Sequence, residues 1–237
     1  MTSVLDRVAR APDRVIVGTE TAGDATDLYL PRGERRGSVV LVHGGFWRAA
    51  YDRTHLRPLA AALADRGWVV LVPEYLRVGQ AGGGWPGSAR DLERVTRRAA
   101  GVCGVDLAAA RLVGHSAGGH LALIVADALG VERVVSLGGV LGLQAAHRDR
   151  LSNDAAGAFI GRSGDMSRAD PMCRAVPRAG VHVLHGADDR EVPATYARAY
   201  AARDPRIRIR ILPGTGHYEL IDPTDAAFAT LLAALGS

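Results

Sequence analysis

The sequence predicts an α/β fold in which helices cover both faces of a mostly parallel central sheet, with an antiparallel hairpin near the N-terminus. Three observations predict it. Short apolar runs rich in valine and leucine recur along the 237 residues. Segments with helical spacing of apolar residues alternate with these runs. Nearly continuous apolar runs are also typical of strands buried on both faces. One domain with a large core can use the whole chain, 1–237.

The first half of the chain passes from exposed to buried strands. Residues 14–20 and 27–31 alternate apolar and polar side chains around Ala22-Gly23-Asp24, which predicts the exposed hairpin. Residues 38–43 contain four consecutive apolar side chains and predict the first buried strand. The elements expected next are a helix at 54–66 that ends at Gly67, a strand at 68–72, a glycine-rich loop at 79–87 and a helix from 88 to about 100.

The second half continues the alternation of strands and helices. It predicts strands at 111–114, 133–137, 181–185 and 207–212, and helices at 117–129, 194–202 and 225–235. Residues 138–179 follow neither period and form a longer connection than is typical of such a fold, so we expect this segment to be irregular. A small cap or lid is one role that connections of this length take.

The charged residues exclude several kinds of chemistry. All 29 basic residues are arginine, which excludes a Schiff-base lysine, a P-loop lysine and a Ser-Lys dyad. The net charge of +4 could suit an acidic partner. The arginines are dispersed, however, and many stand beside an acid, as in Asp52-Arg53. That pattern favours a solvated surface over a nucleic-acid interface.

Neither a membrane span nor a disulfide framework is expected. The most apolar stretch, 121–143, is interrupted by charged residues and glycines, whereas a span needs about 20 unbroken apolar residues. Charged residues are scattered through residues 1–14, so this segment lacks the continuous apolar stretch that a signal peptide needs. Cys103 and Cys173 lack a CxxC partner, so we expect free thiols and a cytoplasmic location. No pattern in the sequence defines an oligomeric state.

One pentapeptide points to nucleophilic catalysis. Gly114-His115-Ser116-Ala117-Gly118 matches G-x-S-x-G, the nucleophile elbow, and lies between a predicted buried strand and a predicted helix. This sharp turn exposes the serine, and larger side chains at the two glycine positions would collide with the backbone. The alternative interpretation is an ordinary glycine-rich turn that buries a serine.

A serine nucleophile needs a base, and the base needs an acid that holds its tautomer. In this fold the acid precedes the histidine in the chain. Of the histidines after position 114, only His217 lies in a loop beyond the last predicted strand, so it is the predicted base. Asp188 and Asp189 both follow the strand at 181–185, and this position alone does not distinguish them. One of the two could instead cap a helix or pair with Arg190.

A glycine-containing loop after the first buried strand supplies candidate oxyanion donors. His43-Gly44-Gly45-Phe46 resembles an HGG-type oxyanion loop. The backbone N–H groups of Gly45 or Phe46, together with that of Ala117, are predicted to stabilise a tetrahedral intermediate. The alternative is a simple glycine turn after a strand.

Loop aromatic residues are candidates for a substrate pocket. Besides Phe46 they are Trp47, Tyr51, Trp85 and Tyr218, and packing between loops explains them equally well. His115 and His120 do not form a metal-binding pattern, because zinc sites need at least three ligands at recognisable spacing. We therefore expect neither a metal nor a cofactor.

Together these segments resemble the esterase, lipase and arylformamidase (kynurenine formamidase-like) branch of the α/β hydrolases, over about residues 38–222. In such families the acid usually stands in D-x-x-V-P, and the segment from Asp189 to Pro193 matches this frame, which selects Asp189. Glu74-Tyr75-Leu76-Arg77 and Trp85-Pro86-Gly87 are similar to motifs of hormone-sensitive-lipase-like esterases. Two departures, Phe46 at the third glycine of HGGG and Leu76 within D-Y-R, concern the substrate rather than the triad.

The resemblance implies a serine hydrolase that forms an acyl-enzyme on Ser116. Its expected substrate is a small carboxylic ester or an activated amide of the formyl-aryl type. Acyl transfer and thioester cleavage are alternatives that would use the same triad. A binding module without catalytic activity is a further alternative, because a fold does not determine a function.

Overall fold

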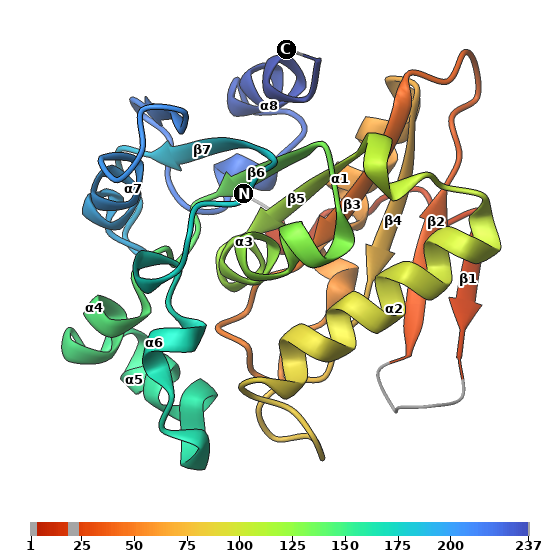
Figure 1. Cartoon of the computed structure of the whole chain (residues 1–237). Helices are drawn as coiled ribbons and strands as arrows, with labels where there is room; N and C mark the ends of the chain where they lie inside the picture. Colours follow the sequence, from red (N-terminus) through yellow and green to blue (C-terminus); the bar gives the residue numbers. More distant parts are fainter. Residues whose placement is uncertain (1–3, 19–23, 237) are drawn as a thin grey trace.

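The computed structural model describes residues 4–18 and 24–236 and contains an eight-stranded sheet (Figure 1). The strand order is β1-β2-β4-β3-β5-β6-β7-β8. Strands β1 and β2 pair antiparallel, β2 pairs antiparallel with β4, and all the remaining pairs are parallel. The predicted fold class is therefore confirmed.

The hairpin forms one edge of the sheet. Its strands are β1, Arg14–Val17, and β2, Ala25–Tyr29, with Ile16 opposite Thr26. On β1 only Ile16 is buried, as the alternating pattern predicts for an edge strand with one face in water. Ala22 and Gly23 of the expected turn lie outside the described residues.

The parallel strands form the centre and the other edge of the sheet. They are β3 Gly37–Val42, β4 Trp68–Pro73, β5 Ala110–His115, β6 Arg133–Leu137, β7 Gly180–Gly186 and β8 Arg208–Leu212. In register, Val40 of β3 lies beside Leu112 of β5. Nearly all side chains of the inner strands β3 to β6 are buried, which explains why these strands read as continuous apolar runs.

Helices cover both faces of the sheet. Helices α1, Arg57–Asp65, and α8, Ala227–Gly236, supply buried side chains to the core on one face. The opposite face packs against α2 Gly87–Cys103, α3 Ala117–Leu129 and α7 Ala194–Ala201. Helix α3 is almost wholly apolar because it packs against the central strands β5 and β6. Short 3-10 turns follow at η1 Val4–Asp6, η2 Arg53–Leu56, η3 Leu107–Ala109 and η6 Glu219–Ile221.

The segment 138–179 is mostly helical, so the expectation of an irregular connection was wrong. It contains α4 Leu143–Arg148, α5 Leu151–Ile160, η4 Gly161–Ser163, α6 Met166–Ala169 and η5 Pro171–Cys173. Helices α4, α5 and α6 gather at one end of the molecule (Figure 1). Helices α4 and α6 have too few turns to show a helical period in the sequence, and α5 is interrupted by positive φ at Ser152, Asn153 and Asp154.

Two other features bear on the sequence-based expectations. Among the described residues, no helix has both the length and the apolar character that crossing a bilayer requires. Cys103 is half-buried in α2 and Cys173 is exposed, and both thiols are free.

Candidate active site

The ends of four parallel strands bring the predicted site residues to one edge of the sheet. Strand β3 leads into the loop at His43, and β5 leads into Ser116. Asp189 follows β7, and His217 follows β8. Because the carboxyl ends of parallel strands share one edge, these residues meet despite their wide separation in sequence.

The backbone at Ser116 has the form of a nucleophile elbow. Ser116 joins β5 to α3 with φ 56° and ψ −121°, a conformation that L-residues rarely adopt and that costs about 1–3 kcal/mol. A Cβ atom on Gly114 would lie 2.2 Å from the Gly118 carbonyl oxygen. A Cβ atom on Gly118 would lie 2.3 Å from the Val42 carbonyl oxygen. The two glycines therefore allow α3 to begin in contact with β3 and β5.

His217 is held by Asp189. The His217 Nδ1 atom lies 2.7 Å from Asp189 Oδ2, and both side chains are nearly inaccessible to solvent. A carboxylate only accepts hydrogen bonds, so His217 carries its proton on Nδ1 and Nε2 keeps a free lone pair. Burial raises the pKa of Asp189, but hydrogen bonds from His185 and His217 outweigh it and hold this pKa well below its ordinary value.

Asp189 has three further hydrogen-bond donors around it. Its Oδ1 accepts from the backbone N–H groups of Glu191, at 2.9 Å, and Val192, at 2.8 Å. His185 Nε2 lies 3.2 Å from Oδ2 and also donates to the Val192 carbonyl at 2.9 Å. Asp188, by contrast, is exposed. The surroundings of Asp189 thus agree with the D-x-x-V-P frame, while the contact from His185 had no signal in the sequence.

His115, at the x position before Ser116 in G-x-S-x-G, supports the loop that carries His217. Its Nε2 donates to the His217 carbonyl oxygen at 3.1 Å, and the two rings lie 4.6 Å apart between centroids. Burial, followed by the neighbouring His217, lowers the pKa of His115 well below its ordinary value. His115 is therefore a neutral ring beneath the His217 loop.

Backbone N–H groups beside Ser116 are available to an oxyanion. Within the described part of the chain, the N–H groups of Gly45, Phe46 and Ala117 donate to no protein acceptor. Gly45 has φ +101° and Phe46 has φ +48°, so the loop turns sharply where these donors lie. Gly45, Phe46 and Ser116 all line the same cavity. Such free donors at the position of a developing negative charge are the structural requirement for an oxyanion hole.

A buried carboxylate lies behind this loop. Glu74 Oε1 is 2.7 Å from His43 Nε2, and the Tyr75 hydroxyl donates to the His43 carbonyl at 3.0 Å. The His43 ring stacks on Tyr75 with 4.3 Å between centroids. Burial raises the pKa of Glu74, but the His43 hydrogen bond and the nearby Arg77 guanidinium lower it below its ordinary value. The segment that resembles the D-Y-R loop thus fixes the first residue of the predicted oxyanion loop, His43 to Phe46.

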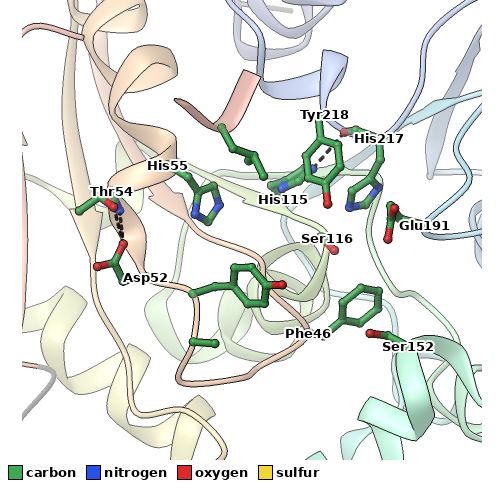
Figure 2. Close-up of a pocket in the computed structure, with 14 residues that line it drawn as sticks. Phe46, Asp52, Thr54, His55, His115, Ser116, Ser152, Glu191, His217 and Tyr218 are labelled. Atoms are coloured by element: carbon green, nitrogen blue, oxygen red, sulfur yellow. Dashed lines mark hydrogen bonds between the residues drawn. The ribbon is translucent and has the colours of Figure 1, made fainter. Parts of the chain in front are cut away.

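The site opens into a cavity of about 290 Å³. Figure 2 shows His217, Tyr218 and Glu191 on one side of Ser116, and His55 and Asp52 on the other. The other lining residues are Leu5, Gly45, Phe46, Ala50, Tyr51, Thr54, His115 and Ser152. Burial, followed by the charge of His43, lowers the pKa of His55 to about 4, so this wall residue is neutral at neutral pH.

Two of the four aromatic residues predicted for the pocket do not line it. Tyr51 and Tyr218 do, together with Phe46. Trp47 is buried instead, stacked on Phe159 of α5 with 4.7 Å between centroids. The Trp85 ring lies 6.4 Å from that of Phe159 between centroids and borders a separate surface hollow. The prediction for Trp47 and Trp85 was wrong because both rings pack near Phe159 of α5 instead of lining the cavity.

Some lining residues had no signal in the sequence. Leu5 comes from the N-terminal segment, His55 from η2 and Ser152 from α5. Ser152 is the contribution of the segment 138–179 to the cavity wall, and the Arg48 guanidinium donates to it at 3.0 Å. Among the described residues, no three His, Cys, Asp or Glu side chains gather in a way that could hold a metal ion.

The sheet order, the strand–serine–helix turn and the strand-end loops define the α/β-hydrolase class. The sequence matches the BD-FAE family over residues 26–150, more than half of the chain, and the chain belongs to this family. No curated protein matches the chain in sequence.

Solved structures share the fold across nearly the whole chain. A putative thioesterase from Silicibacter sp. tm1040 is 24% identical with a TM-score of 0.78, covering 98% of this chain and 87% of its own. Esterase B from Lactobacillus rhamnosis is 19% identical with a TM-score of 0.74, covering 96% and 86%. A hormone-sensitive lipase from a metagenome library is 15% identical with a TM-score of 0.73, covering 96% and 85%. These likenesses confirm the α/β-hydrolase fold.

Proposed function

We propose that this protein is a serine hydrolase that cleaves a small carboxylic ester or an activated, formyl-aryl type amide through an acyl-enzyme on Ser116. The observation that carries the proposal is the 2.7 Å contact from Asp189 to His217 Nδ1, beside a serine in a strained elbow. Ser116 and His217 line one cavity, and the Asp189 contact leaves Nε2 of His217 as the free basic nitrogen. The hydrogen bond between a catalytic serine and its histidine base commonly tightens only when substrate binds.

The reaction would proceed in two halves. Ser116 Oγ attacks the carbonyl carbon while its proton passes to His217 Nε2, and the N–H groups of Phe46 and Ala117 stabilise the oxyanion. The carbonyl re-forms, the bond to the leaving group breaks, and His217 returns the proton to that group. Water then attacks the acyl-enzyme with the same base, which releases the acid and restores Ser116.

The cavity favours a small substrate. Its volume of about 290 Å³ lies at the lower end of ligand pockets, which span about 300–1,000 Å³. Phe46, Tyr51 and Tyr218 offer aromatic surface to an acyl or aryl group. The esterases and the putative thioesterase of similar fold are named for ester or thioester chemistry, which agrees with an acyl-enzyme here.

The Ser116→Ala variant tests the proposal. Removal of the nucleophile should lower kcat for p-nitrophenyl acetate by at least about 10³-fold and abolish labelling by a fluorophosphonate. Circular dichroism and a melting curve would establish that the variant is folded. Turnover near the wild-type rate would overturn the assignment of Ser116, and an unlabelled, inactive wild-type protein would favour a binding module.

A further inference from the structure

The N-terminal segment 4–10 takes part in the cavity. Its η1 turn lies against η2, which carries His55. Val4 and Leu5 are half-buried against the apolar cluster on the face of the sheet that α1 and α8 cover. Leu5 lines the cavity together with His55, Ser116 and Tyr218. The apolar side chain of Leu5, which precedes Ser116 by more than 100 residues in the chain, is therefore part of the cavity wall.

The same segment is fastened to the loop that carries His217. Arg7 Nη2 donates to Asp222 Oδ2 at 2.6 Å, and the Asp222 side chain is only 7% exposed. Asp222 Oδ1 accepts from the backbone N–H and the hydroxyl of Thr224, at 2.9 and 2.8 Å, which fixes the carboxylate. Asp222 caps the end of η6, and η6 begins directly after Tyr218. Arg7 thus ties the segment to the wall of the cavity near the proposed base.

From this arrangement we infer that Leu5 is a specificity-determining residue that limits the size of an apolar group in the substrate, with Arg7 as its positioning residue. The inference rests on the proposed function and extends it. A leucine side chain offers no hydrogen bond, so the substrate group beside it must be alkyl or aryl rather than polar. In a cavity of about 290 Å³, one bulky wall residue decides whether a longer chain fits.

The test compares Leu5→Ala with Val8→Ala. Val8 belongs to the same segment but is 99% exposed, so its truncation is the matched control. For each protein, kcat/KM is measured with p-nitrophenyl acetate, butyrate and hexanoate, which vary the acyl group. Phenyl and 1-naphthyl acetate vary the leaving group. Leu5→Ala should raise the ratio for long over short substrates at least about 5-fold in one series, and Leu5→Trp should lower it.

The role of Arg7 has its own variant. Arg7→Ala should move the same ratio in the same direction as Leu5→Ala, since the segment would lose its tether to Asp222. Val8→Ala should keep kcat for the shortest substrate within about threefold, because Val8 is exposed and does not line the cavity. If Arg7→Ala lowers all substrates equally, the tether does not position Leu5.

The failure of this inference can be told apart from the failure of the proposed function. Labelling rates with ethyl and octyl fluorophosphonates report wall size without turnover and need only a reactive Ser116. If Ser116→Ala removes labelling but Leu5→Ala changes every ratio by less than twofold, only the role of Leu5 is overturned. Equal shifts in Leu5→Ala and Val8→Ala would also overturn it. If Ser116→Ala is labelled like the wild type, the proposed function itself fails.

Discussion

His217 and Asp189 illustrate how single atoms decide what the site can do. The contact at Nδ1 sets the tautomer of His217, and the opposite nitrogen is left as the basic one. Asp189 is held by His185 and by two backbone N–H groups, so its carboxylate has little freedom to turn away. The neighbouring Asp188 is exposed and supplies a natural comparison.

We expect Asp189→Asn to lower kcat by about 10³–10⁴-fold, because an amide nitrogen facing Nδ1 would favour the wrong tautomer. Asp188→Asn should leave kcat within about twofold. Both variants would be measured with the same ester and the same folding controls. Equal losses in the two variants would contradict the assignment of Asp189 as the acid.

Glu74 is a second residue whose buried negative charge holds its neighbours in place. Its Oε1 lies 2.7 Å from His43 Nε2, and its Oε2 lies 3.5 Å from Arg53 Nη1. Glu74→Gln should destabilise the protein by about 3–5 kcal/mol, because buried cations lose their counter-charge. Glu93→Gln is the control: its pair with Arg97 lies at the surface and is about half exposed, so its loss should cost less than about 1 kcal/mol. Urea denaturation would measure both costs. Similar costs would show that the Glu74 network does not act as a buried support of the loop from His43 to Phe46.

At the scale of elements, the junction of β5 and α3 depends on close backbone approach. Gly118→Ala would place a methyl group 2.3 Å from the Val42 carbonyl oxygen and 2.5 Å from that of His43. We expect a loss of stability of at least about 1–3 kcal/mol, together with a loss of activity as Ser116 moves.

The matched substitution lies in α2. Gly101 is an exposed helical residue, and a Cβ atom placed on it would meet nothing within 4 Å. Gly101→Ala should stabilise the protein by roughly 0.5–1 kcal/mol, since alanine favours the helix and restricts the unfolded chain. Thermal melting of the two variants would give shifts of opposite sign; a stabilising Gly118→Ala would contradict the packing described for the elbow.

The whole molecule buries several histidines as neutral rings, and this affects its stability toward acid. His115 is buried beside His217, and His120 of α3 bonds to the Ala169 carbonyl at 2.8 Å. Burial lowers the pKa of His120 to about 4, against about 6.5 in an unfolded chain. Between these values the unfolded state binds more protons, so stability falls as the pH decreases from about 6.5 toward 4.

We therefore expect the free energy of unfolding to be lower at pH 5 than at pH 7, with His120 alone contributing roughly 2 kcal/mol. Asp189 does not contribute in this range, because its carboxyl is ionised in both states above pH 5. Urea denaturation at pH 5, 6 and 7 gives the slope, and His120→Gln should make it shallower. Equal stability at pH 5 and pH 7 would contradict the burial of neutral histidines.

The sequence carried much of this architecture in its local patterns. Helix α3 and strand β6 lie at the predicted residues 117–129 and 133–137, because each is a strongly apolar run followed by a glycine. Helices α4 and α6 were not predicted because they are short, and α5 because its first turn departs from right-handed helical geometry. The candidate site residues could be predicted from the sequence because each follows a strand, and parallel strands end at one edge of the sheet.

By itself, the sequence determined the strand and helix alternation, the elbow at Ser116 and the candidate partners Asp189 and His217. Only the tertiary structure decided which side chains surround them. His185 and His115 support Asp189 and His217, Trp47 stacks on Phe159 of α5, and Leu5 lines the cavity. The physical reason is range: local patterns reflect the backbone conformation of neighbouring residues, whereas the walls of a cavity depend on packing between residues far apart in the chain.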